Sequence, residues 1–233
     1  MIRAVGFDLD DTLLDHRGAA TNGIASLLHQ QGWTYKGEHE LGAEWAAIER
    51  VYFDQYRLGN LTMDEQRRER MRAILEMVNV DLREIEIKNL FAEYLKHYAK
   101  SWTAFPDALP ILNELKGAGF RLAVLTNGQQ QQQEAKLARI GMTDMFEKVL
   151  AIGSLSALKP ECGAFMDLCS VFDAAPNEVV YVGDDVHRDA IAATEAGLHG
   201  VWLNREGESA PPGVKAEVRT LAPLLSAIDA LNR

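Results

Sequence analysis

Acidic, basic and small polar side chains recur at four places in the chain, each after an apolar segment typical of a buried strand. Asp8 and Asp10 follow the first segment and share parity, so in extended backbone their side chains would point the same way. The other places hold the pair Thr126 and Asn127, then Lys159, and then the pair Asp184 and Asp185 with Asp189 a turn later. Residues of these types serve as nucleophiles, acids, bases and ion ligands.

Three carboxylates, those of Asp8, Asp10 and Asp184, would share one pocket if these strand ends meet. Two unit charges about 4 Å apart repel by about 4 kcal/mol at an effective dielectric constant near 20. Such a cluster must take up protons or bind a cation, and oxygen ligands with open water positions suit Mg²⁺. Lys159 adds a fixed positive charge, so the set resembles a receptor for a phosphoryl group once hydroxyl or amide donors join it.

Each of these residues also has an ordinary structural explanation. Aspartate is common where a strand meets a loop, and Asp15 is expected to start the first helix in that way. A single Asp-x-Asp, threonine or lysine would indicate little. The hypothesis of a phosphoryl-transfer site depends on all four groups appearing in order, each after a predicted strand.

Strands are predicted to alternate with helices outside residues 16–100. The predicted strands are 2–9, 121–125, 146–152, 178–182 and 200–203. The predicted helices are 107–116, one ending at Ile140, one after Pro160, 187–196 and 221–231. This alternation implies an α/β fold with a parallel sheet covered on both faces and an active site at the carboxyl ends of the strands. The glutamine run from Gln129 to Gln133 is expected to be a solvated helix face, whose start could border the pocket.

Residues 16–100 show no convincing strand pattern and predict a run of four helices. Thr62 and Glu65 form the signature of a capping box at the start of one helix, and Asp81 and Glu84 repeat it at the start of the next.

Aromatic side chains at helical spacing, Trp33, Trp45 and Tyr52, are expected in the core of this helical segment. The basic cluster from Arg67 to Arg70 is interrupted by an acid and is interpreted as a solvated helix face. With a formal net charge of −10, the chain is a poor match to the phosphate backbone of a nucleic acid polymer.

The composition is that of a globular protein, with 233 residues of which 47% are hydrophobic. Cys162 and Cys169 have a spacing that suits neither a disulfide framework nor a zinc site, so free thiols and a cytoplasmic location are expected. Asp8 and Asp10 interrupt the first apolar run, which argues against a signal peptide. No stretch approaches the ~20 apolar residues of a membrane span.

The four groups resemble the motifs of the haloacid dehalogenase superfamily of hydrolases. The resemblance covers about residues 1–205 and consists of Phe7 to Thr12, Leu125 to Asn127, Lys159 with Pro160, and Gly183 to Asp185 with Asp189. It looks most like the branch that holds pyrimidine 5′-nucleotidases and N-acylneuraminate-9-phosphatases. It implies a Rossmann-like core of residues 1–15 and 101–233, with a small all-helical cap of residues 16–100 inserted after the first strand.

The resemblance also implies catalytic roles. Asp8 would be the nucleophile that forms an aspartyl-phosphate, and Asp10 would be the general acid and then the general base. Mg²⁺ would bind Asp8, Asp184 and the backbone carbonyl of Asp10. Lys159 would offset the negative charge on Asp8.

Binding roles follow from the same resemblance. Thr126, Asn127 and Lys159 would bind the substrate phosphate, and Asp185 and Asp189 would lie near the metal or orient Lys159. The implied activity is Mg²⁺-dependent hydrolysis of a small phosphate monoester, either a sugar phosphate or a nucleoside monophosphate. A monomer and a homodimer both remain open.

Three other activities compete with a phosphatase. A haloacid dehalogenase of the same superfamily needs no general acid, so the carboxylate of Asp10 favours the phosphatase. A phosphomutase needs the same carboxylate pair, and only an acceptor assay would separate it. A non-catalytic module that binds Mg²⁺ or phosphate is the third, and turnover of p-nitrophenyl phosphate would exclude it.

Overall fold

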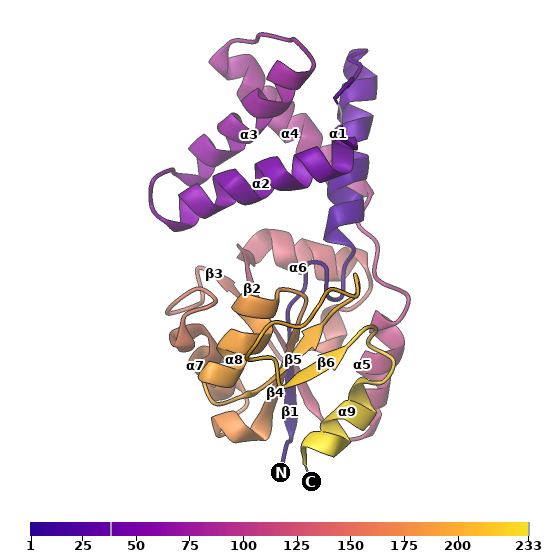
Figure 1. The fold of residues 1–233 in the computed structure, drawn as a ribbon, viewed down its shortest axis with the longest axis vertical. Coiled ribbons are helices and arrows are strands. Elements are labelled where there is room, and N and C mark those ends of the chain that lie inside the picture. Colours follow the sequence, from indigo (N-terminus) through magenta and orange to yellow (C-terminus); the bar gives the residue numbers. More distant parts are fainter. Residues whose placement is uncertain (38, 233) are drawn as a thin grey trace. The chain divides into compact units, whose positions relative to one another are not determined.

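The computed structural model describes residues 1–37 and 39–232, which form two compact units (Figure 1). The α/β unit comprises Met1–Asp15 and Thr103–Arg233, and the helical unit comprises His16–Trp102. Among the described residues, no helix is both long and apolar enough to cross a membrane.

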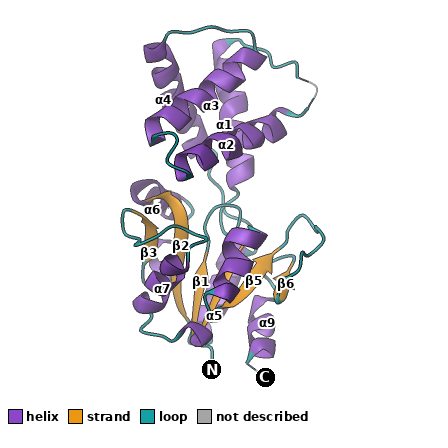
Figure 2. Ribbon diagram, turned by 60° about the vertical axis from the view of Figure 1, so that its left-hand side comes forward, coloured by secondary structure: helices purple, strands orange, loops and turns teal. Residues whose placement is uncertain are grey.

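A six-stranded parallel sheet forms the centre of the α/β unit, with strand order β3-β2-β1-β4-β5-β6 (Figure 2). The strands are β1 (Ala4–Phe7), β2 (Arg121–Gln129), β3 (Val149–Ile152), β4 (Val179–Gly183), β5 (His199–Leu203) and β6 (Ala216–Val218). Every residue of β1 and β4 is buried, as expected for central strands covered on both faces. The predicted α/β class and parallel sheet are confirmed, and β6 is a strand that the sequence pattern did not reveal.

The helices of this unit pack their apolar residues on the sheet. They are α5 (Ala108–Gly117), α6 (Gln130–Arg139), α7 (Cys162–Val171), α8 (Ala192–Glu195) and α9 (Leu224–Leu231). Phe165 and Leu168 of α7 are fully buried in a cluster that includes Tyr181 of β4. A Cβ atom on Gly6 would lie 2.4 Å from Leu168 Cδ2, so glycine in β1 permits the close approach of α7.

Several predicted elements differ from the structure at their ends; for example, β2 continues to Gln129 and β3 begins at Val149 rather than at residue 146. The first strand ends at Phe7 rather than residue 9, because the chain turns between Asp10 and Leu14, with Asp11 in the left-handed region at φ 58°. The predicted helix 187–196 begins as a π-type turn, Val186–Ile191, before α8.

Four helices make up the helical unit, in agreement with the prediction, and the described part of residues 16–102 contains no strand. They are α1 (His16–Gln31), α2 (Leu41–Arg57), α3 (Met63–Met77) and α4 (Glu84–Lys100). The capping box of α3 is confirmed: the Glu65 backbone N–H donates to Thr62 Oγ1 at 3.2 Å, and the Thr62 N–H donates to Glu65 Oε2 at 2.7 Å. The second predicted box is wrong, because Glu86 accepts from the Arg83 N–H at 2.9 Å and α4 begins later.

The core of the helical unit contains Trp45 as predicted, and Trp33 and Tyr52 pack against it half-buried. The interpretation of Arg67 to Arg70 as a solvated face is wrong for Arg70, which is buried. Its guanidinium is 2.7 Å from Glu49 Oε1 and lies over the ring of Trp45, so the charge is paired inside the unit.

The two crossings between the units are tied together within the α/β unit. Leu14 and Ala104 form an isolated antiparallel bridge, and the Asp15 N–H donates to Thr103 O at 3.0 Å. The chain therefore leaves the α/β unit and returns to it at neighbouring points.

Candidate active site

The candidate residues follow the central strands of the sheet at their carboxyl ends. β1 lies between β2 and β4, so Asp8 stands between Thr126, near the end of β2, and Asp184, just after β4. The Asp8 N–H donates to Val182 O at 2.9 Å, which extends the pairing of β1 with β4 by one residue. The convergence predicted from strand order is therefore present for these residues.

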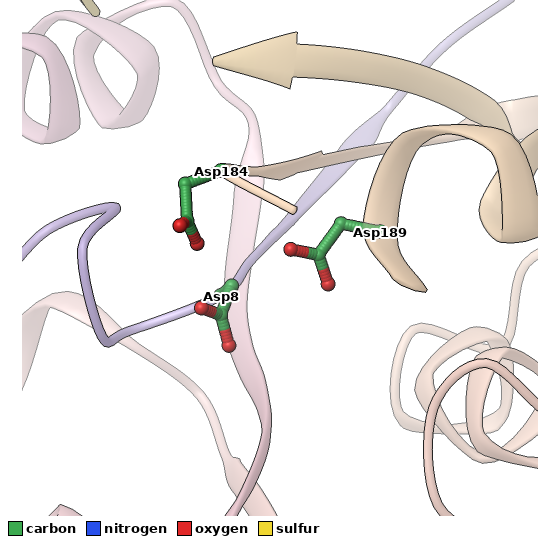
Figure 3. Close-up of side chains that lie close together, drawn as sticks. All are labelled: Asp8, Asp184 and Asp189. Atoms are coloured by element: carbon green, nitrogen blue, oxygen red, sulfur yellow. The ribbon is translucent and has the colours of Figure 1, made fainter. Parts of the chain in front are cut away.

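A cluster of three carboxylates lies at this point: Asp8, Asp184 and Asp189 (Figure 3). Each can offer one oxygen, and these oxygens all lie within 4.8 Å of one another. Asp8 and Asp189 are buried, whereas Asp184 is half-buried. A set of hard oxygen donors this close suits Mg²⁺, because repulsion among the carboxylates is relieved by a divalent cation.

Burial raises the pKa of Asp8 to about 7. Lys159 opposes this effect, whereas the nearby charges of Asp189 and Asp10 add to it. Without a cation, the central carboxylate of the cluster is therefore easily protonated near neutral pH.

Lys159 is the buried positive charge of the site. Its ammonium donates to Asp189 Oδ1 at 2.6 Å, to the hydroxyl of Tyr181 at 2.8 Å and to Asp8 Oδ1 at 2.9 Å. Burial alone would lower the pKa of Lys159, but the charges of Asp189 and Asp8 outweigh it and hold the pKa well above its usual value. Lys159 therefore stays charged and fixes the rotation of the Asp8 carboxylate.

Asn127 uses its side chain to hold the loop that carries Lys159. Its Nδ2 donates to Lys159 O at 2.8 Å, and its Oδ1 accepts from the Lys159 N–H at 2.9 Å. The family resemblance implies that Asn127 binds the substrate phosphate, and this stays a prediction; the structure shows its side-chain amide paired with the peptide of the buried lysine.

The carboxylate of Asp10 contacts two residues of α6 that the sequence analysis did not select. Lys136 Nζ lies 2.6 and 2.8 Å from its two oxygens, and Gln133 Nε2 lies 3.0 Å from Oδ2. Gln133 is fully buried, so the interpretation of Gln129 to Gln133 as a solvated face is wrong at its last residue. A useful signal was the spacing: positions three apart share a helix face, and this helix directly follows a strand that carries site residues.

Thr126 is buried, and Gln133 links it to Asp10. Its Oγ1 accepts from Gln133 Nε2 at 2.9 Å and from the Gly128 N–H at 3.2 Å.

Asp185 lies outside the carboxylate cluster. Its Oδ1 accepts from the backbone N–H groups of His187 and Arg188, and its Oδ2 lies 2.6 Å from the Arg188 guanidinium. Burial would raise the pKa of Asp185, but Arg188 and these N–H groups hold it below its usual value. Asp189 is the residue that contacts Lys159, and its Oδ2 also accepts from the Asp185 N–H at 3.1 Å.

Comparisons with known proteins identify relatives that match most of the chain. A model of the haloacid dehalogenase-like hydrolases matches residues 2–197. A glyceraldehyde 3-phosphate phosphatase of Methanopyrus kandleri is 30% identical over 88% of this chain and 85% of its own. The human N-acylneuraminate-9-phosphatase is 28% identical over 98% of this chain and 95% of its own.

Among solved structures, a protein of Bacillus subtilis described as the HAD-hydrolase YfnB, bound to magnesium, has a TM-score of 0.83. The match covers 100% of this chain and 99% of that protein at 22% sequence identity, and likeness at that identity shows a shared fold.

Proposed function

The chain belongs to the haloacid dehalogenase-like hydrolases, and from this premise we propose that it is a Mg²⁺-dependent phosphatase acting on a small phosphate monoester. The observation that carries the proposal is the placement of Asp8. Its carboxylate is fixed by Lys159, stands within a cluster of metal-binding type, and is followed two residues later by a second carboxylate, Asp10.

In the first step, a carboxylate oxygen of Asp8 attacks phosphorus and the bond from phosphorus to the leaving oxygen breaks. Asp10 donates its proton to that oxygen, so the leaving group departs as an alcohol. Lys159 keeps Asp8 oriented for attack through the bond to Oδ1. The Thr126 hydroxyl donates a hydrogen bond to an oxygen of the phosphoryl group that is transferred.

In the second step, water attacks the phosphorus of the aspartyl-phosphate and the bond from phosphorus to the Asp8 oxygen breaks. Asp10, now a carboxylate, takes the proton from that water. Inorganic phosphate leaves and Asp8 is regenerated. Splitting hydrolysis through a covalent intermediate replaces one difficult step by two easier ones.

Asp8, Asp184 and Asp189 would hold Mg²⁺, together with the backbone carbonyl of Asp10 that the family resemblance adds. When bound, the cation supplies positive charge that offsets the negative charge of the phosphoryl group. Arg188 keeps Asp185 out of this cluster, so we assign Asp185 to the support of the turn that carries Asp189.

We assign the helical unit to the inserted cap of the family and propose a sugar phosphate or a nucleoside monophosphate as substrate. The named activities of the relatives support a phosphorylated metabolite of this size. Cys162 and Cys169 are free thiols, which supports a reducing compartment such as the cytoplasm as the location of the protein.

Hydrolysis of p-nitrophenyl phosphate by wild type and Asp8→Asn, with and without Mg²⁺, tests the proposal. We expect turnover that needs Mg²⁺, a labelled phospho-enzyme in wild type, and neither in Asp8→Asn. Asp144→Asn, which alters an exposed carboxylate, is the matched control and should behave as wild type. Activity of Asp8→Asn within tenfold of wild type would contradict the assignment of the nucleophile. If the assignment holds, turnover of a panel of sugar phosphates and nucleoside monophosphates identifies the substrate.

A further inference from the structure

We infer that Gln133 and Lys136 position the Asp10 carboxylate for proton transfer. The inference rests on the proposed function, in which Asp10 is the general acid and base. Both are positioning residues, since they act on the reaction through Asp10. Gln133 and Lys136 together form the α6 clamp.

The contacts of the α6 clamp fix Asp10 at both of its oxygens. Lys136 Nζ lies 2.6 Å from Oδ1 and 2.8 Å from Oδ2, and Gln133 Nε2 lies 3.0 Å from Oδ2. A carboxylate held by donors at both oxygens cannot rotate without losing a charge-assisted hydrogen bond. The direction in which Asp10 faces is thus set from α6.

Burial shows that the α6 clamp is not a surface contact. The Lys136 side chain is 2% exposed, against 26% for Asp10. An ammonium is costly to bury unless it is paired, so its position depends on a carboxylate partner. Glu134 and Arg139 on the same helix are exposed, and the other buried residue of α6, Leu137, is apolar, so the two clamp residues are its buried polar groups.

Gly128 gives independent support, because the strand leaves room for the clamp there. A Cβ atom on Gly128 would lie 1.9 Å from Gln133 Nε2. Gly128 is not among the glycines with positive φ, so its backbone conformation does not require glycine. Its missing side chain is instead what lets the Gln133 amide reach Asp10.

Gln133 also links Asp10 to Thr126. The two hydrogens of its amide nitrogen serve Asp10 Oδ2 at 3.0 Å and Thr126 Oγ1 at 2.9 Å. Thr126 Oγ1 accepts a second hydrogen bond from the Gly128 N–H, so both of its lone pairs are used. The Thr126 hydroxyl is left to act as a donor, which is what a phosphoryl oxygen requires.

The test is a double-mutant cycle between Lys136→Met and Asp10→Asn, with Arg139→Met as the matched control. Methionine keeps much of the volume of lysine and removes the charge. Single-turnover phosphorylation of Asp8 is measured with p-nitrophenyl phosphate and with phenyl phosphate, whose leaving group is poorer and needs the proton of the acid more. Steady-state turnover is measured in parallel.

We expect Lys136→Met to slow phosphorylation by phenyl phosphate at least tenfold more than phosphorylation by p-nitrophenyl phosphate, within the ~10²–10⁴ of general acid catalysis. In the Asp10→Asn background, Lys136→Met should slow phosphorylation by phenyl phosphate less than about threefold, because its effect passes through Asp10. Gln133→Met and Gly128→Ala should show the same selectivity, and Arg139→Met should match wild type. Normal phosphorylation by p-nitrophenyl phosphate reports that Lys136→Met is folded, and urea unfolding reports it for Gln133→Met and Gly128→Ala, which also disturb Thr126.

The clamp would be overturned if Lys136→Met slowed phosphorylation equally with both phosphate donors. It would also be overturned if the rate losses of Lys136→Met and Asp10→Asn multiplied fully in the double variant. If Lys136→Met does not fold, Gln133→Met and Gly128→Ala decide by the same criteria. A wild-type protein that hydrolyses no phosphate ester would overturn the proposed function instead. An Asp10→Asn variant without leaving-group selectivity would overturn the acid–base role of Asp10, and the clamp with it.

Discussion

The hydroxyl of Tyr181 accepts a hydrogen bond from the Lys159 ammonium at 2.8 Å and donates one to Leu125 O at 2.7 Å. Tyr181 has one hydroxyl hydrogen, and the carbonyl takes it, so the tyrosine can only accept from Lys159. Burial raises the pKa of Tyr181 well above its usual value, which keeps this hydrogen in place. The backbone of β2 thus orients the lysine that holds Asp8.

Tyr181→Phe should therefore impair both stability and turnover. The change leaves a buried carbonyl and a buried ammonium short of one partner each, and we expect a loss of about 1–3 kcal/mol in the free energy of unfolding. kcat should fall while KM changes little, because Tyr181 is fully buried and acts through Lys159. Urea unfolding and steady-state kinetics check this, with Tyr56→Phe of the helical unit as the control. Wild-type values of both quantities would contradict the role given to the hydroxyl.

Magnesium should stabilise the protein more at pH 8 than at pH 5.5. Burial raises the pKa of Asp8 from 3.8 to about 7, so the folded metal-free protein binds a proton there that the unfolded chain does not. The stability from this proton is present below pH 3.8 and is lost as pH rises to about 7. Mg²⁺ needs the ionised form, and its affinity should fall about tenfold per pH unit below 7.

The measurement is the gain in Tm on adding Mg²⁺ at each pH. Groups remote from the site change the Tm equally with and without Mg²⁺, so their titration drops out of this difference. Asp8→Asn removes the titrating group and should show a small gain that does not depend on pH. A wild-type gain that is equal at the two pH values would show that Asp8 does not bind the cation.

Sequence reasoning worked where the signal is local and failed where partners are distant. Asp8 and Thr126 could be located because each follows an apolar run, and parallel strands bring their ends together. Lys136 could not be located in this way, since its burial depends on Asp10, which lies 126 positions away in the chain. Arg70 was misplaced for a similar reason: only the packing of α2 against α3 reveals Glu49 as its partner.

Removing both partners of the Arg70–Glu49 pair should cost less stability than removing Arg70 alone. The guanidinium is buried, and Glu49 is half-buried and also contacts His16 Nε2 through Oε2 at 3.1 Å. Arg70→Met therefore removes the guanidinium from a half-buried acid, although the histidine contact remains. We expect about 2–4 kcal/mol for Arg70→Met and a smaller loss for Arg70→Met with Glu49→Leu. Urea unfolding gives both values, together with the loss for Glu49→Leu alone. Strictly additive losses would show that the two charges do not interact.

The two thiols should differ in reactivity. Cys162 is exposed at the start of α7, whereas Cys169 is buried and burial raises its pKa to about 11. A disulfide reagent at pH 8 should react rapidly with one thiol in the native protein and with two in urea. Cys162→Ser should abolish the rapid reaction. Two rapid thiols in native wild type would mean that α7 opens readily.

The tie between Asp15 and Thr103 bears on the order in which the chain folds. β1 precedes the other described strands of the sheet in the chain, yet its partner β2 begins at Arg121, after the whole insertion. Within the helical unit, His16 and Tyr98 share a hydrogen bond of 2.7 Å, so the folded insertion brings its own ends together. If it folds first, the loop that β1 and β2 must close shrinks from roughly 110 residues to about 30, which lowers the closure cost by about 1 kcal/mol. A long insertion therefore need not delay the sheet, provided that the helices, whose contacts are local, assemble before the strands pair.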